Sequence, residues 1–157
     1  MRKRVIGLPP CESIEEYSRW LAVPRLARVE VTSEDIGHPI ESVFTFGESS
    51  GWRAGSPGRQ SIRLIFDQPQ AMERICLRFD ETELVRTQEF TLRWSHNGAR
   101  GFQEIVRQQW NFSPDGSTYE FEDYLVDLVG VSVLELTVDP DIGGRKATAK
   151  LTSWRVA

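Results

Sequence analysis

The stretch Phe90-Thr91-Leu92-Arg93-Trp94-Ser95 decides the fold class of this chain. Its apolar residues alternate strictly with polar ones, which is typical of a strand with one face buried and the other in water. His96-Asn97-Gly98 follows directly, and Asn-Gly favours the positive φ angles of a tight hairpin turn. The stretch therefore predicts a half-buried strand that ends in a chain reversal.

The same alternation occurs in residues 62–66 and 75–79. Three neighbouring one-sided strands predict an antiparallel sheet that buries its apolar face against a second sheet. Further strands are expected at residues 28–32, 43–46, 52–54, 103–110, 117–126, 131–138 and 147–156. This spacing predicts an all-β fold, an antiparallel β-sandwich of the jelly-roll type.

One short helix is expected before the strands. Ser13 and Glu16 form a capping box, the apolar residues behind them fall at helical spacing, and Pro24 prevents continuation. A helix over about residues 13–22 is therefore predicted. The expected organisation is an N-terminal lead, residues 1–27, followed by one β-sandwich domain, residues 28–157.

Charge and composition narrow the classes of partner. The 157 residues carry a formal net charge of -4, which does not favour nucleic acid or anionic membranes. No apolar run spans a bilayer, and the basic residues 1–4 lack the apolar segment of a signal peptide, so a cytoplasmic location is expected. Two cysteines form no disulfide framework, although a Cys11–Cys76 bridge stays open, and no zinc-ligand spacing occurs.

Several short motifs occur in a characteristic order. They are residues 29–33, 51–54, 60–67, 72–79, 90–98 with Phe102, 136–140 and 151–156. This order resembles the discoidin-type, or coagulation-factor C, domain within the galactose-binding-like jelly rolls. The resemblance implies a non-catalytic domain that binds sugars, phospholipid head groups or other proteins through loops at one end of the sandwich.

By position, the binding loops implied by the resemblance are residues 33–41, 53–60 and 80–88, with residues 139–146 as a fourth. Antiparallel strands also place Arg59 and Asp80 close together. Calcium-binding relatives carry a glutamate where Thr152 and Ser153 stand here, so no calcium or other cofactor is expected. The acidic first loop offers only Ile36 to a membrane, so membrane binding is not expected either.

Six residues of this predicted loop end are candidate ligand-binding residues: His38, Glu41, Arg53, Arg59, Glu81 and Arg86. The basic side chains suit hydroxyls or a carboxylate, and the glutamates suit hydroxyl donors. Trp52 is a possible aromatic platform, but a core position is favoured for it. Trp94 and Trp154 are also expected in the core, while Trp110 is left open.

Carbohydrate binding without chemistry is the first functional hypothesis. The alternative is a protein–protein interaction module of a cytoplasmic complex, which the expected location favours. Glu81 with Glu83, or Asp139 with Asp141, could be read as catalytic carboxylate pairs, but such pairs in surface loops are usually solvated charge. An enzyme is therefore not expected.

Overall fold

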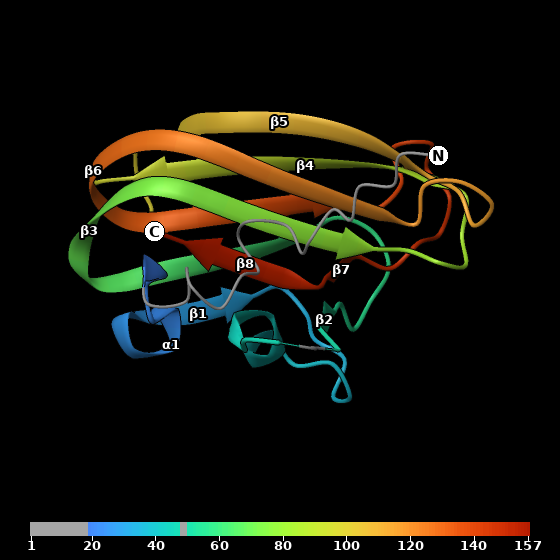
Figure 1. Ribbon diagram of the computed structural model, residues 1–157, viewed down its shortest axis with the longest axis horizontal. Coiled ribbons are helices and arrows are strands. Elements are labelled where there is room, and N and C mark those ends of the chain that lie inside the picture. Colours follow the sequence, from blue (N-terminus) through green and yellow to red (C-terminus); the bar gives the residue numbers. More distant parts are fainter. Residues whose placement is uncertain (1–18, 48–49) are drawn as a thin grey trace, which may run out of the picture.

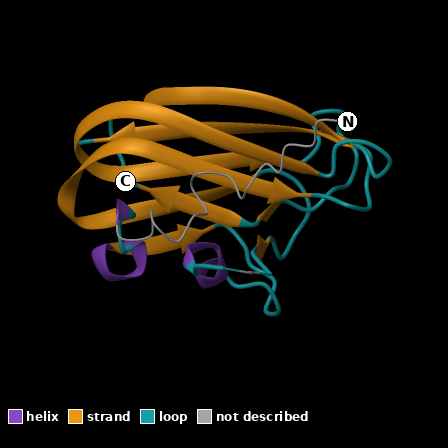
Figure 2. Ribbon diagram, viewed as in Figure 1, coloured by secondary structure: helices purple, strands orange, loops and turns teal. Residues whose placement is uncertain are grey.

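The computed structural model describes residues 19–47 and 50–157 of a mainly β-stranded chain (Figures 1 and 2). Its elements are α1 (Val23–Leu26), β1 (Ala27–Val31), η3 (Ile40–Phe44, a 3-10 helix), β2 (Trp52–Arg53), β3 (Gln60–Asp80), β4 (Arg86–Ser95), β5 (Gln103–Phe112), β6 (Tyr119–Asp139), β7 (Lys150–Leu151) and β8 (Ser153–Val156). All strand pairs are antiparallel, which confirms that prediction. In the described part of the chain, no helix has the length and hydropathy to cross a membrane.

Two strands of 21 residues each, β3 and β6, run through both layers of the sandwich. One layer has the strand order β1-β3-β6-β4-β5 and contains the first half of β3 and the second half of β6. In the other layer, the second half of β3 lies between β8 and the first half of β6. Figure 1 shows both strands curling over at the same end of the molecule. Each was predicted as two separate strands. Each strand stays continuous because the pairing between β3 and β6 does not end at the bend. Register shifts in β3 lie between Ile65 and Arg74, and Gly130 in β6 takes a φ of 75°; both accompany the bend.

The three strands predicted as neighbours are therefore not adjacent in one sheet. The segment 62–66 and the segment 75–79 are the two halves of β3 and lie in different layers, and β6 separates β3 from β4. Alternation reports which face of a strand is buried, but it carries no information about which strand pairs with it.

The core lies between the two layers and follows the predicted alternation. Ile62, Leu64 and Leu92 have no exposed surface. Phe79 in one layer stacks on Phe90 in the other, with ring centroids 5.2 Å apart. The hydrophobic residues of the two layers thus form one cluster.

The tryptophans divide between core and rim. Trp52 and Trp154 are core residues, as predicted. Trp94 is only half-buried and packs against the core. Trp110, which was left open, is also half-buried, and its indole N–H donates to Ser117 Oγ at 2.9 Å.

Three local predictions need correction or fall outside the described residues. Residues 43–46 were predicted as a strand, but residues 43 and 44 belong to η3 and residues 45 and 46 are in no strand. The carbonyl oxygen of Val43 accepts from Arg155 Nη1 at 2.7 Å. The helix predicted over 13–22 falls mainly outside the described residues, and residues 21–22 are not helical. Pro24 lies in the first turn of α1, where proline is tolerated. Gly98 takes a positive φ of 58° but Asn97 does not. The Arg100 amide donates to Asn97 O at 3.2 Å, so the central residues of the turn are Gly98 and Ala99 rather than Asn97 and Gly98.

Cys76 shares the outer face of β3 with Arg74 and Arg78, but it is almost completely buried. Its thiol lies 3.3 Å from Asp123 Oδ1, and Arg74 binds the same carboxylate. Cys11 lies outside the described residues, so a Cys11–Cys76 bridge stays a possibility of the sequence alone.

A row of alternating charges crosses the outer face of the five-stranded layer. The strand register aligns Glu30, Arg63, Glu135, Arg93 and Glu104 on β1, β3, β6, β4 and β5. Glu135 at the centre is buried, and it accepts from the Nε atoms of Arg63 at 2.7 Å and Arg93 at 2.9 Å. Opposite charges directly across strands stabilise their pairing, so this row supports the strand order.

Glu135→Gln is expected to lower the unfolding free energy at pH 7 by about 1–3 kcal/mol, because two arginines lose their charged acceptor. Burial raises the pKa of Glu135, but Arg93 and Arg63 outweigh it and hold the pKa below its usual 4.5. A depressed folded-state pKa means that the stabilisation is present above about pH 4.5 and is lost on acidification below it. Urea unfolding of both proteins at neutral and acidic pH tests this.

Glu30→Gln is the matched control, because Glu30 ends the same row with half of its side chain exposed. It is expected to cost less than about 1 kcal/mol. Equal losses for the two variants would show that the central glutamate has no special role.

Candidate functional site

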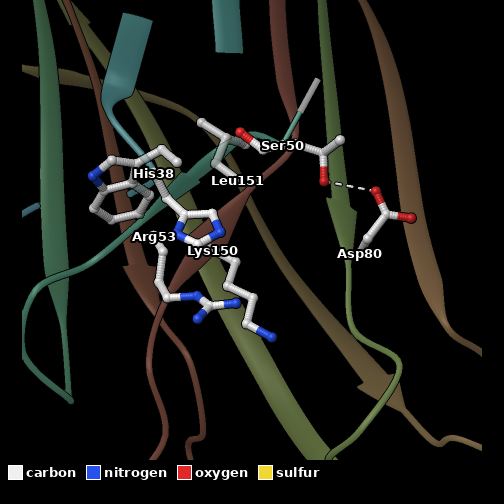
Figure 3. A pocket seen from close by; sticks show the side chains of 8 residues that line it. His38, Ser50, Arg53, Asp80, Lys150 and Leu151 are labelled. Atoms are coloured by element: carbon white, nitrogen blue, oxygen red, sulfur yellow. Dashed lines mark hydrogen bonds between the residues drawn. The ribbon is translucent and has the colours of Figure 1, made fainter. Parts of the chain in front are cut away.

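A pocket opens beside the β2–β7 pair, where the end of β3 approaches the first loop (Figure 3). The residues that line it are His38, Ser50, Trp52, Arg53, Asp80, Lys150, Leu151 and Thr152. Side chains from four separate segments thus converge at one place. Hydrogen-bond donors, acceptors and both signs of charge are represented, which suits a polar ligand.

The first loop, residues 33–41, is held against β2 by backbone hydrogen bonds. The Asp35 amide donates to Arg53 O at 2.9 Å, and the Arg53 amide donates to His38 O at 3.2 Å. Gly55 lies close enough that a Cβ there would be 2.7 Å from Glu34 O. These contacts place His38 over β2 and at the pocket.

His38 is oriented by Asp35. Its Nδ1 lies 3.1 Å from Asp35 Oδ2, while the Gly37 amide donates to Oδ1 of the same carboxylate at 3.2 Å. These bonds, the Gly37 amide first and His38 next, hold the pKa of Asp35 below its usual value. Because an ionised Asp35 can only accept, Nδ1 carries the proton and Nε2 of a neutral His38 is an acceptor available to a ligand.

Asp80 forms the opposite side of the pocket, at the end of β3. Thr152 Oγ1 donates to its Oδ2 at 2.6 Å (Figure 3), and Arg78 donates to both oxygens at 3.1 and 3.2 Å. The side chain keeps 37% of its surface exposed. A carboxylate has about four lone-pair positions, so Asp80 retains capacity to accept from a ligand hydroxyl.

Arg53 and Lys150 are partners in the β2–β7 register. Residues directly opposite in an antiparallel pair point to the same face, so both cations project together, as Figure 3 shows. Lys150 Nζ lies 3.3 Å from Glu81 Oε2. Arg53 Nε is buried and has no hydrogen-bond partner among the described residues.

Glu81 and Arg86 are buried and do not line the pocket. Arg86 Nε donates to Glu81 Oε1 at 2.8 Å, and its Nη1 donates to Pro140 O at 2.8 Å. Burial raises the pKa of Glu81, but hydrogen bonds from Arg86 and the Glu83 amide outweigh it and leave the pKa below its usual value. The pair is placed to hold the 80–88 loop and Lys150 rather than to reach a ligand directly.

The structure brings only some of the sequence-predicted site residues together. His38 and Arg53 line the pocket. Glu41 is exposed on η3, and Arg59 is exposed directly before β3. The two ends of β3 do lie at the same end of the molecule (Figure 1), but of Arg59 and Asp80 only Asp80 lines the pocket.

Sequence reasoning missed Lys150 as a site residue. Residues 147, 149 and 151 are buried while 148, 150 and 152 are less so. That alternation is visible in the sequence and indicates that Lys150 and Thr152 share the outer face of their strand. What the sequence does not show is that this face meets β2. In the described ranges 19–47 and 50–157, no cluster of three potential metal ligands occurs.

Gly51→Ala is expected to distort the pocket and to cost about 1–3 kcal/mol of stability. Gly51 has a φ of 68°, and a Cβ there would lie 2.5 Å from Leu151 O, so β2 would move away from β7. Gly58→Ala is the matched control, because Gly58 has a φ of 89° with nothing within 4 Å. It isolates the conformational cost, about 1 kcal/mol. Thermal unfolding of both variants measures the difference, and equal losses would contradict the proposed contact.

The bent two-layer sandwich with polar loops at one end is the galactose-binding-like jelly roll, the fold that the sequence motifs predicted. No protein-family model and no curated protein sequence matches the chain. Among solved structures, the family 32 carbohydrate-binding module of NanJ from C. perfringens, in complex with galactose, matches with a TM-score of 0.65 and 12% identity, covering 87% of this chain and 96% of that one.

Two other matches are modules with different ligands. A pectin-binding carbohydrate-binding module matches with a TM-score of 0.61 and 17% identity over 83% of this chain and 89% of its own. The family 32 module of AlyQ, in complex with 4,5-unsaturated mannuronic acid, matches with a TM-score of 0.61 and 14% identity, covering 84% of this chain and 95% of that one. A Ruminococcus gnavus fucosidase also matches, but over only 26% of that chain. The three binding modules named here are each matched over at least 89% of their own length, whereas the fucosidase is matched over 26% of its chain.

Proposed function

We propose that this chain is a non-catalytic carbohydrate-binding module that holds a sugar in the pocket formed by His38, Arg53, Asp80 and Lys150. One observation carries the proposal: oriented donors and acceptors from four segments converge on one exposed pocket. Sugar hydroxyls both donate and accept, so they fit a site in which Asp80 accepts and Arg53 donates. The neighbours with galactose, pectin and mannuronic acid ligands support the same reading.

The pocket chemistry also favours binding over hydrolysis. Glycoside hydrolysis normally requires two carboxylates that flank the scissile bond. Among the lining residues that the structure describes, Asp80 is the single carboxylate, and Arg78 and Thr152 hold it. Glu81, the next acidic residue, is buried against Arg86.

A glycan array, followed by calorimetry on the best glycan, tests the proposal. The wild type is expected to bind, and Arg53→Met to weaken binding by about 10- to 100-fold, because a charged hydrogen-bond donor is removed. Arg59→Met is the matched control, since Arg59 is an exposed arginine that does not line the pocket. The proposal would be refuted if the wild type bound no glycan on the array, or if both variants lost the same amount of affinity.

A further inference from the structure

The Arg53–Lys150 pair is unusual for a sheet. Two positive side chains stand directly opposite each other in the short β2–β7 ladder and share one face. Like charges at such positions destabilise a strand pair. The fold does not require this arrangement, because β2 and β7 are joined by their backbone and by the buried residues Trp52 and Leu151.

Among the described residues, Glu81 is the single carboxylate that forms an ion pair with either of these two cations. Glu81 binds Lys150 at 3.3 Å, but the same carboxylate is shared with Arg86 and the Glu83 amide. No ion pair involves Arg53 within the described residues, where its Nε is buried without a partner. Asp35, the acid beside Arg53, is already bound by Gly37 and His38. One more negative group would therefore complete the site.

Neutral sugars are usually held by an aromatic face packed against their C–H surface. Trp52 is the aromatic residue that lines the pocket, and only 1% of it is exposed. The ring is therefore available at most at its edge. Arginine, by contrast, binds carboxylates through two parallel N–H bonds, which are stronger than bonds to neutral hydroxyls.

We propose that the ligand is an acidic sugar, a uronic acid residue, whose carboxylate lies between Arg53 and Lys150. Its ring hydroxyls then face Asp80 and His38 on the remaining sides of the pocket. This inference rests on the proposed carbohydrate-binding function and specifies its ligand class. It also accounts for the like-charge pair as a feature of binding rather than of folding.

Calorimetry with uronic acid oligomers and their methyl esters tests the proposal on the intact chain. The panel comprises trimers of galacturonic, glucuronic, mannuronic and guluronic acid, each beside its fully esterified form, which keeps the ring and removes the charge. At least one acid is expected to bind tenfold or more tightly than its ester. Raising the salt concentration is expected to weaken the binding of the acid and to leave the binding of the ester unchanged.

Arg53→Met is expected to abolish the preference for the acid, and Arg53→Lys to keep part of it, while Arg59→Met keeps it in full. Without ligand, Arg53→Met should melt at or above the wild-type temperature, because it removes a like-charge pair. This separates loss of binding from loss of folding.

Two results would overturn the acidic-sugar inference and leave the carbohydrate-binding proposal standing. In the first, the esters bind as tightly as the acids or more tightly. In the second, no acid binds while a neutral glycan binds on the array. If no uronic acid bound and no glycan on the array bound, both the acidic-sugar inference and the carbohydrate-binding proposal would be overturned.

Discussion

Glu81→Leu is expected to destabilise the protein by about 3–5 kcal/mol at pH 7, because it leaves the Arg86 guanidinium buried without its anion. Arg86 and Glu81 side chains are 1% and 0% exposed, and their contact is 2.8 Å. The guanidinium also lies over the Phe112 ring, 4.7 Å from its centroid. Water therefore cannot replace the lost partner. Urea unfolding gives the free energy directly.

The double variant Glu81→Leu with Arg86→Met is expected to recover most of that loss, since apolar residues of similar size often replace a buried ion pair without a net penalty. The control is Glu104→Gln, which touches the exposed Arg107–Glu104 pair and should cost less than about 1 kcal/mol. If the double variant were as unstable as the sum of the single ones, the two charges would act independently.

A second large effect concerns Glu120 and pH. Glu120 is completely buried: its Oε1 accepts from Gln88 Nε2 at 3.3 Å, and its Oε2 has no partner among the described residues. Burial, and then the charge of Glu122, raises the pKa of Glu120 from 4.5 to about 8. The folded protein therefore keeps this carboxyl protonated at neutral pH.

The direction of the pH effect follows from that shift. A folded-state pKa above the unfolded value gives a contribution to stability that is fully present below pH 4.5 and is lost as the pH rises through about 8. The size of the change is on the order of 5 kcal/mol. Glu120→Gln keeps a neutral side chain at every pH, so its unfolding free energy should vary less over this interval and exceed that of the wild type at alkaline pH.

Urea unfolding from about pH 5 to about pH 9 compares the two proteins. Glu83→Gln is the matched control, because it removes an exposed glutamate from the neighbouring loop and should follow the wild-type profile. Burial also raises the pKa of Glu122, so a small slope is expected to remain in the Glu120 variant. Parallel profiles for wild type and Glu120→Gln would contradict the assignment.

The sequence predicted which loops form the candidate site, but not which of their charged side chains are buried. His38 and Arg53 were found because polar residues in loops at one end of a sandwich are natural ligand contacts. Glu81 and Arg86 belong to the same loop end, yet their side chains are buried. Their burial depends on Pro140, Gln88 and Lys150, partners that are distant or unremarkable in the sequence. Charge alone does not tell a buried ion pair from a solvated one.

Local periodicity by itself determined that this chain is an antiparallel β protein, because the burial of alternate residues follows the apolar–polar alternation of segments such as 62–66. Only the tertiary structure decided that β3 and β6 each bend through both layers, and that β2 meets β7 so that Arg53 stands opposite Lys150. The physical reason is that strand pairing joins residues nearly a hundred positions apart through backbone groups that are the same in almost every residue. The pocket exists because of those pairings.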